Sequence, residues 1–404
     1  MTKFTREFIR AIPKTDLHVH LDGSLRLATL IELAKEQKVE LPSYTEEGLS
    51  KLVFKKVYAD LDEYLLGFLY TAAVMVTPEA LERIAYELAL DNFEEGVRYV
   101  EPRFAPQRHA HKSFSLDETI ISVDLGLSRA KKEINARPEI RDGSEPPFDY
   151  GIIGCAIRMF TPEYSGYYRQ LMGIHPHMPK EDLYGLAALD LVRTMIDVRN
   201  DKGLPVTGFD IAGAERGYPA EDYKRAFDLA VKHFFKKTVH AGEAYGPVSI
   251  FQAITDCHAD RIGHGTNLFD EDMVELPTAI ERSRYVRELW QYIADRRTCI
   301  EVCLTSNMQT VPGLKEISKH PFAHMFKNRL SLTLCTDNRL VSHTSVTDEI
   351  ELAVRNFPIE PRKLKDIIIY GFKRSFYPGD YMAKRAYIRR AIDYYEKMEK
   401  KFGV

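Results

Sequence analysis

The sequence has 404 residues, of which 45% are hydrophobic and 28% charged, and its formal net charge is −3. This composition is typical of a globular protein with a sizeable core, either one large barrel domain or two ordinary domains. The small net charge gives no reason to expect a nucleic acid or an acidic membrane as a partner.

Short apolar, β-branched segments alternate with longer stretches of helical periodicity along the chain. Helices are predicted at 78–95 and 220–236, each after a proline-containing start signal. The predicted strands are, in chain order, 15–20, 97–103, 150–157, 206–211, 237–241, 260–263, 298–304 and 331–336. This alternation predicts a parallel sheet, most simply a (β/α)8 TIM barrel with additional helices. An open doubly wound sheet is the alternative, although no G-x-G-x-x-G follows the first strand.

Two tracts, 136–148 and 161–180, lack clear periodicity and are predicted to be irregular connections. Residues 1–12 lack the apolar centre of a signal peptide, and no stretch approaches membrane-spanning length. The five cysteines are an odd number without any C-x-x-C spacing, so we expect buried free thiols rather than disulfides or a thiolate zinc site. A cytoplasmic protein is the expectation.

The chemistry-bearing residues gather where the predicted strands end, which is where barrel enzymes place their active sites. His18 and His20 are two residues apart on a strand, so their side chains project to one side and could bind one metal ion. Asp22 continues this parity. Later strand ends add His240 with Glu243, His264, and Asp337 with Asn338. Three histidines and an aspartate are a suitable ligand set for a hydrolytic zinc site at the carboxyl ends of the strands.

Each of these signals also has an ordinary structural interpretation. A histidine next to glycines, as at His240 and His264, is compatible with a simple turn. Asp337 followed by Asn338 is typical of a turn or a helix N-cap. Two further H-x-H pairs do not lie at strand ends and are expected to be exposed: His109/His111 and His175/His177.

Taken together and in this order, the motifs resemble the adenosine deaminase family of the amidohydrolase superfamily, most of all bacterial members with a T-D-N motif. The resemblance covers most of the chain. It rests on residues 13–23 (PKTDLHVHLDG), 95–101, 208–213, 240–243 (HAGE), 261–265 (RIGHG), 306–307 and 336–338 (TDN). The other zinc deaminase class carries P-C-x-x-C, which is absent here. The resemblance implies one metal-dependent hydrolase domain over residues 1–404.

The resemblance implies one Zn²⁺ ion per chain, with His18, His20, His240 and Asp337 as its ligands. It makes Glu243 the acid that protonates N1 of the purine. His264 would orient the zinc-bound water and help to deprotonate it, and Asp337 would accept a hydrogen bond from that water. These roles agree with the chemistry, because attack on an aromatic C6 needs a protonated ring nitrogen and an activated water.

For the substrate, the resemblance implies contacts from four residues. The carboxylate of Asp22 would bind the ribose 5′-hydroxyl, beside His20. The backbone of Gly213 would face N3 of the base. Asn338 stands where better-known members have an aspartate, and its amide would donate to N7.

One predicted helix has two interpretations. Its apolar residues recur at helical spacing: Leu61, Tyr64, Leu65 and Phe68. The resemblance implies a lid over the substrate, whereas the pattern alone equally fits a helix packed on the core.

The function that the resemblance implies is hydrolytic deamination of adenosine and 2′-deoxyadenosine, a small-molecule purine nucleoside substrate. Alternatives within the class are deaminases of adenine or of a 5′-modified adenosine, such as methylthioadenosine or aminodeoxyfutalosine. Because barrels host many chemistries, cleavage of an amide or phosphoester is a further alternative, although no bridging lysine for a two-metal site is obvious. A non-catalytic purine-binding protein is disfavoured because every expected ligand and the acid are present. The oligomeric state is left open.

Overall fold

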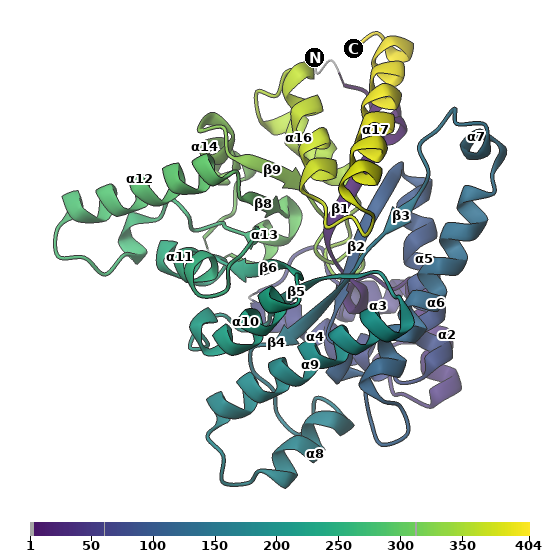
Figure 1. Cartoon of the computed structure of the whole chain (residues 1–404), viewed down its shortest axis with the longest axis vertical. Coiled ribbons are helices and arrows are strands. Elements are labelled where there is room, and N and C mark those ends of the chain that lie inside the picture. Colours follow the sequence, from purple (N-terminus) through teal and green to yellow (C-terminus); the bar gives the residue numbers. More distant parts are fainter. Residues whose placement is uncertain (1–3, 60, 312) are drawn as a thin grey trace.

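The computed structural model describes residues 4–59, 61–311 and 313–404. The strands lie at the centre of the molecule, and the helices surround them (Figure 1). The strands are β1 (Lys14–His20), β2 (Val97–Phe104), β3 (Asp149–Tyr150), β4 (Ile152–Ile157), β5 (Val206–Ala212), β6 (Lys236–Ala241), β7 (Arg261–His264), β8 (Cys299–Val302) and β9 (Ser331–Leu334).

The helices in the first half of the chain are α1 (Arg6–Ala11), α2 (Leu27–Gln37), α3 (Glu46–Leu52), α4 (Leu61–Ala73), α5 (Pro78–Glu94), α6 (Leu116–Asn135), α7 (Pro138–Arg141), α8 (Gly166–Ile174) and α9 (Lys180–Lys202). Those in the second half are α10 (Lys224–Lys232), α11 (Pro247–Thr255), α12 (Ala279–Arg296), α13 (Leu304–Thr310), α14 (Phe322–Lys327), α15 (Val346–Asn356), α16 (Pro361–Arg374) and α17 (Tyr381–Phe402). None of these helices is both long enough and apolar enough to cross a membrane.

The strands form one parallel series in the order β1-β2-β4-β5-β6-β7-β8-β9, and the short β3 pairs with β2. The series closes just beyond β9, where Val19 of β1 bridges Asp337 in parallel. Beside this bridge, the Asp16 carboxylate accepts hydrogen bonds from the Thr336 hydroxyl (2.6 Å) and backbone N–H (3.3 Å). The fold is therefore a (β/α)8 barrel with additional helices, as predicted.

The predicted strands are confirmed with small shifts of their ends. The segment 150–157 is divided between β3 and β4 at Gly151, and the segment 298–304 stops at Val302 because α13 begins at Leu304. The helix predicted at 78–95 is α5. Its first turn is capped by the Thr77 hydroxyl, which accepts a hydrogen bond from the Ala80 N–H (3.2 Å).

One of the two tracts predicted to be irregular, 161–180, differs from the prediction. Residues 161–180 contain α8, nine residues capped by Ser165, whose hydroxyl accepts from the Tyr168 N–H (3.2 Å). Tyrosines and glycines weakened the helical pattern in the sequence. In Figure 1, α8 projects from the barrel at the lower end of the view. The tract 136–148 is mainly a connection, with only the four-residue α7 in it.

The barrel interior contains a buried charge network. Arg103 of β2 donates to Asp210 of β5 (2.7 Å) and to Glu301 of β8 (2.9 Å), and all three side chains are fully buried. Arg261 of β7 pairs with Glu301 and with Glu101 of β2. Such burial is unfavourable unless each charge is paired and hydrogen-bonded, which is the case here.

Replacing Arg103 should destabilise the fold strongly. Arg103→Ala leaves Asp210 and part of Glu301 uncompensated in the barrel, so we expect the free energy of unfolding to fall by about 3–5 kcal/mol. Urea unfolding followed by circular dichroism measures this loss. Arg389→Ala breaks the exposed pair with Asp393, and it should cost only about 0–1 kcal/mol. Equal losses in the two variants would contradict a structural role for the buried network.

Candidate active site at the carboxyl ends of the strands

The site begins where β1 meets the turn after β9. Asp337 lies between the two histidines of β1: its N–H donates to the His18 carbonyl (2.7 Å), and its carbonyl accepts from the His20 N–H (2.7 Å). Asp337 has a φ of +62°, a left-handed conformation that is unusual for a residue other than glycine. Barrel closure thus places the three side chains at one point.

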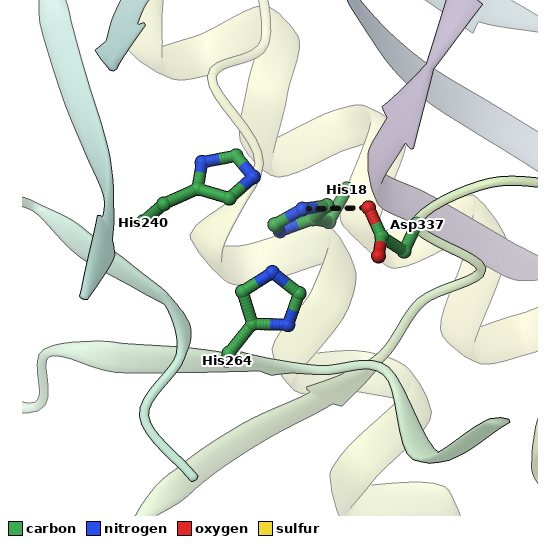
Figure 2. Close-up of side chains that lie close together, drawn as sticks. All are labelled: His18, His240, His264 and Asp337. Carbon is green, nitrogen blue, oxygen red and sulfur yellow. Dashed lines mark ion pairs between the residues drawn. The ribbon is translucent and has the colours of Figure 1, made fainter. Parts of the chain in front are cut away.

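Four side chains converge there, those of His18, His240, His264 and Asp337 (Figure 2). One ligand atom from each lies within 4.8 Å of all the others. His20 adjoins this group, since its Nε2 is 3.1 Å from His240 Nε2 and 3.5 Å from Asp337 Oδ1. The structure therefore brings together all four predicted metal ligands and adds His264 as a neighbour.

The protonation states of these side chains suit a cation. Burial lowers the pKa of His240 to about 4 and that of His20 well below its usual value, so both rings are neutral at pH 7. Burial alone would raise the pKa of Asp337, but the neighbouring histidines, His18 first, outweigh it and lower that pKa. His18 Nε2 lies 3.4 Å from Asp337 Oδ1, the contact drawn in Figure 2, and has no hydrogen-bond partner. An orphaned nitrogen lone pair next to a carboxylate is what a metal ion would satisfy.

The far nitrogens of two histidines are held by the barrel network. His18 Nδ1 is 2.7 Å from Glu301 Oε2, and His240 Nδ1 is 3.0 Å from Asp210 Oδ2. Arg103 contacts both carboxylates. Carboxylates in this position fix the tautomer and orientation of a metal-binding imidazole, with Nε2 free to face the metal.

His264 is oriented differently, through a chain of hydrogen bonds. The Phe322 N–H donates to His320 Nδ1 (3.0 Å), so the proton of neutral His320 lies on Nε2, which faces Asn307 Oδ1 (3.3 Å). Burial lowers the pKa of His320 to about 3 and keeps it neutral. The Asn307 amide then donates to His264 Nδ1 (3.0 Å). We infer from this chain that neutral His264 carries its proton on Nε2.

Glu243 stands beside His264. Its Oε2 is 3.8 Å from His264 Nε2, and its Oε1 accepts from the Thr310 hydroxyl (3.0 Å). Burial, followed by the charges of Asp337 and Glu215, raises the pKa of Glu243, although His264 and Thr310 oppose the shift. This is the direction of shift that a general acid requires, because a higher pKa makes the carboxyl keep its proton more readily than an ordinary glutamate does.

A pocket opens above the cluster and contains every other predicted contact residue. It is lined by His20, Asp22, Tyr64, Leu65, Phe68, Arg108, Ile157, Ala212, Gly213, His240, Glu243, His264, Asp337 and Asn338. Asp22 Oδ1 is buried and has no hydrogen-bond partner. Asn338 donates one amide hydrogen to the Tyr64 hydroxyl (2.8 Å), which leaves the second for another acceptor.

Helix α4 satisfies both interpretations of its apolar pattern. Tyr64 and Phe68 are buried and Leu65 is exposed, yet all three line the pocket. The side chain of Leu61 lies outside the described part of the structure. A core-facing stripe and a pocket wall are thus the same face of this helix.

The other histidine pairs do not join the site. His109 is 1% exposed and stacks on Phe104, so the prediction of an exposed residue is wrong, while His111 is partly exposed. His175 is partly exposed and His177 fully exposed.

Several functional residues were missed in the sequence: Arg103, Asp210, Glu215, Glu301, Asn307, Thr310 and His320. Arg103, Asp210 and Glu301 are strand residues inside the barrel, and such residues look like ordinary alternating positions. Asp210 and Asn307 carried a signal through the family resemblance, because they lie in the segments 208–213 and 306–307.

The fold and site define a class, that of metal-dependent hydrolases built on a (β/α)8 barrel. The family model described as adenosine deaminase matches residues 13–166 and 185–393, and its gap covers most of α8. The chain belongs to the adenosine deaminase family. It is 34% identical over 376 residues to an adenosine deaminase of Mycobacterium avium, with 93% of each chain covered.

Two solved structures share the fold. An amidohydrolase from Burkholderia ambifaria with bound zinc has a TM-score of 0.76 at 20% identity, covering 98% of this chain and 94% of that one. The Arabidopsis N6-mAMP deaminase has a TM-score of 0.72 at 25% identity, covering 96% and 99%.

Metal content should separate the roles of His20 and His264. His20→Ala removes a lone pair that faces the cluster, so we expect most of the metal to be lost. His264→Ala should retain it, because its Nε2 carries a proton and its Nδ1 is already engaged by Asn307. Plasma mass spectrometry of the purified variants measures this, with the exposed His177→Ala as control. Metal loss from His264→Ala alone would reverse the assignment.

Proposed function

We propose that this protein catalyses the hydrolytic deamination of adenosine and 2′-deoxyadenosine to inosine and deoxyinosine, with release of ammonia. The observation that carries the proposal is the position of Glu243. A carboxyl with a raised pKa stands in the same pocket as a cluster of histidines and an aspartate. Relatives named adenosine deaminase, which match over nearly the whole chain, support this reaction.

We assign the metal site to His18, His20, His240 and Asp337, and the metal to one zinc ion. Two neutral imidazoles, the orphaned Nε2 of His18 and a charged carboxylate are the donors that zinc prefers. The zinc found in the Burkholderia ambifaria amidohydrolase supports the choice. A zinc ion held by these residues would lower the pKa of a water molecule to about 7 and would so supply a nucleophile at neutral pH.

The chain's own residues control the protons of the reaction. Glu243 donates its proton to N1 of the purine, which makes C6 electrophilic while water adds to that carbon. The Asp337 carboxylate accepts a hydrogen bond from the attacking water, and the Nε2–H of His264 donates one to it. We therefore assign His264 to orienting the water and not to deprotonating it, the second role that the family resemblance implies. The water gives up both of its protons: one goes to the amino group at C6, which leaves as ammonia, and the other restores the proton on Glu243.

The pocket favours a nucleoside over the free base. The unpartnered Oδ1 of Asp22 is a hydrogen-bond acceptor that we assign to the ribose 5′-hydroxyl. Gly213 has a φ of +97°, and its backbone lines the pocket where we place N3 of the base. The free amide hydrogen of Asn338 suits N7, which is purely an acceptor.

One observation favours a second candidate substrate, a 5′-phosphorylated adenosine. Arg108 is the one arginine or lysine among the described residues that line the pocket, and its guanidinium makes only a long contact to the Phe68 carbonyl (3.4 Å) and stacks near Tyr164. Its charge acts on Asp22. A guanidinium near the 5′ end of a bound nucleoside would suit a phosphate.

We also propose a cytoplasmic location. All five cysteines are buried free thiols, as expected for a reducing compartment.

Loss of the acid should abolish turnover without loss of binding. For Glu243→Gln, we expect kcat for adenosine to fall by about 10²–10⁴-fold, because an amide cannot protonate N1. The ultraviolet absorbance change from adenosine to inosine measures kcat, and calorimetry with inosine measures binding. Glu275→Gln, an exposed glutamate, is the matched control. Absence of adenosine turnover by the zinc-loaded wild-type protein would overturn the proposed function, and near-wild-type turnover by Glu243→Gln would remove Glu243 as the donor.

The 5′ end of the substrate should be sensitive to Asp22. In Asp22→Ala, we expect kcat/KM for adenosine to fall by about 10–100-fold, the usual loss for a hydrogen bond to a charged group. The rate with 5′-deoxyadenosine should barely change, since this compound lacks the hydroxyl. The same assay with adenine, AMP and methylthioadenosine ranks the alternative substrates. Equal losses with adenosine and 5′-deoxyadenosine would contradict the assignment, and a gain with AMP would favour the phosphorylated substrate.

A further inference from the structure

Glu215, three residues beyond the end of β5, makes an unusual set of contacts. Its side chain is buried, with 4% of the residue exposed. Its carboxylate accepts hydrogen bonds from four consecutive backbone N–H groups, those of Gly242 (2.8 Å), Glu243 (3.0 Å), Ala244 (2.7 Å) and Tyr245 (3.0 Å). The Ser249 hydroxyl donates a fifth hydrogen bond.

These donors make the turn an anion-binding site within the chain. Successive N–H groups that converge on one point favour a negative charge, and here Gly242 supplies the left-handed conformation with a φ of +74°. Among the described residues, no lysine, arginine or histidine forms an ion pair with Glu215. Its carboxylate is therefore held by the four N–H groups of the turn and by the Ser249 hydroxyl, and the turn in its present form depends on that carboxylate.

Residue Asn267 holds the opposite side of the same turn. Its side-chain amide donates to the carbonyls of Glu243 (3.0 Å) and Tyr245 (3.3 Å), and its backbone N–H donates to the Gly242 carbonyl (2.8 Å). The N–H groups and the carbonyls of the turn are thus fixed from two directions. If the Glu215 carboxylate is removed, the Asn267 contacts remain, but they supply no acceptor for the four N–H groups of the turn.

We propose that Glu215 is a positioning residue for the reaction: it holds the turn of residues 242–245 so that the Glu243 carboxyl stands at N1 of the purine. This inference rests on the proposed function, in which Glu243 is the proton donor. Glu215 touches the backbone of Glu243 but lies outside the set of residues that line the pocket. Its effect on the reaction therefore depends on where it places the Glu243 side chain.

The test compares Glu215→Gln with Glu221→Gln, the same chemical change at an exposed position six residues away. In Glu215→Gln, the amide nitrogen must face an N–H donor and the charge is gone, so the turn loosens. We expect kcat for adenosine to fall by about 10–100-fold, because a displacement of roughly 1 Å at a reacting group has this effect. KM should change less than about threefold, since the contacts that bind the substrate remain. Zinc content should match that of wild type.

A ligand pair shows whether the effect reaches N1. Inosine carries a hydrogen on N1, whereas 1-deazaadenosine has carbon in that place and cannot interact with a carboxyl there. In Glu215→Gln, inosine should bind more weakly and 1-deazaadenosine as in wild type, measured by calorimetry. Glu215→Asp keeps the charge on a shorter side chain and should recover part of kcat. Ser249→Ala keeps the carboxylate and its four backbone donors, and its kcat should stay close to wild type.

Hydrogen–deuterium exchange gives a readout that needs no turnover. Peptides that contain residues 242–245 should exchange faster in Glu215→Gln, with no change elsewhere in the barrel. If the wild-type protein fails to deaminate adenosine and this local change is still seen, the proposed function fails and the fixing of the turn stands. Wild-type kcat and exchange in Glu215→Gln would overturn the positioning role. A general rise in exchange with loss of zinc would overturn it too, in favour of a purely structural role.

Discussion

The candidate site depends on one buried cationic side chain, that of Arg103. Arg103 contacts Asp210 and Glu301, and these two carboxylates hold the far nitrogens of His240 and His18. Burial would raise the pKa of Glu301, but the charges of Arg103 and Arg261 outweigh it and keep that pKa well below its usual value. The carboxylates therefore stay ionised, and each has an oxygen within 3.0 Å of a ring nitrogen. The lone pairs of Nε2 then point to a common centre, and the orientation of both histidines follows from charge pairing inside the barrel.

Two carboxyl groups at this centre have pKa values that are shifted in opposite directions. The pKa of Asp337 is lowered, since neighbouring histidines outweigh the effect of burial, whereas burial raises the pKa of Glu243. His264 lies near both groups, with its Nε2 3.8 Å from Glu243 Oε2 and a ring nitrogen within 4.8 Å of an Asp337 oxygen. A pair of acids whose pKa values are pushed apart is the arrangement in which one accepts and the other donates protons. Here the difference arises from the number of histidines that each carboxyl faces.

The site residues at the ends of strands could be predicted from the sequence, because a barrel brings the carboxyl ends of its strands together whatever the conformation of its loops. His18, His20, His240 and Asp337 are examples. Arg103 and Glu301 were not predictable in this way, since an interior position of a closed barrel shows no local pattern that separates it from an outer one. The chain from His320 through Asn307 to His264 was hidden as well, because it joins segments that only tertiary packing places in contact.

The errors have equally local causes. His109 was expected to be exposed because basic and polar residues flank it, yet it is buried against Phe104. Residues 161–180 were expected to be irregular, yet they form α8 through the Ser165 cap and contacts with the loop after β2. In both cases burial by distant segments decided the outcome, and short stretches of sequence do not report it.

Backbone groups do as much as side chains to shape this site. Asp337 is held in a left-handed backbone conformation, which costs a residue other than glycine about 1–3 kcal/mol. Its two backbone hydrogen bonds to β1 offset this cost. The same two bonds close the barrel between its last strand and its first. Closure of the barrel and assembly of the candidate metal site are therefore one structural event. A change that weakens the contact of Asp337 with β1 acts on both, because no other segment places the carboxylate between His18 and His20.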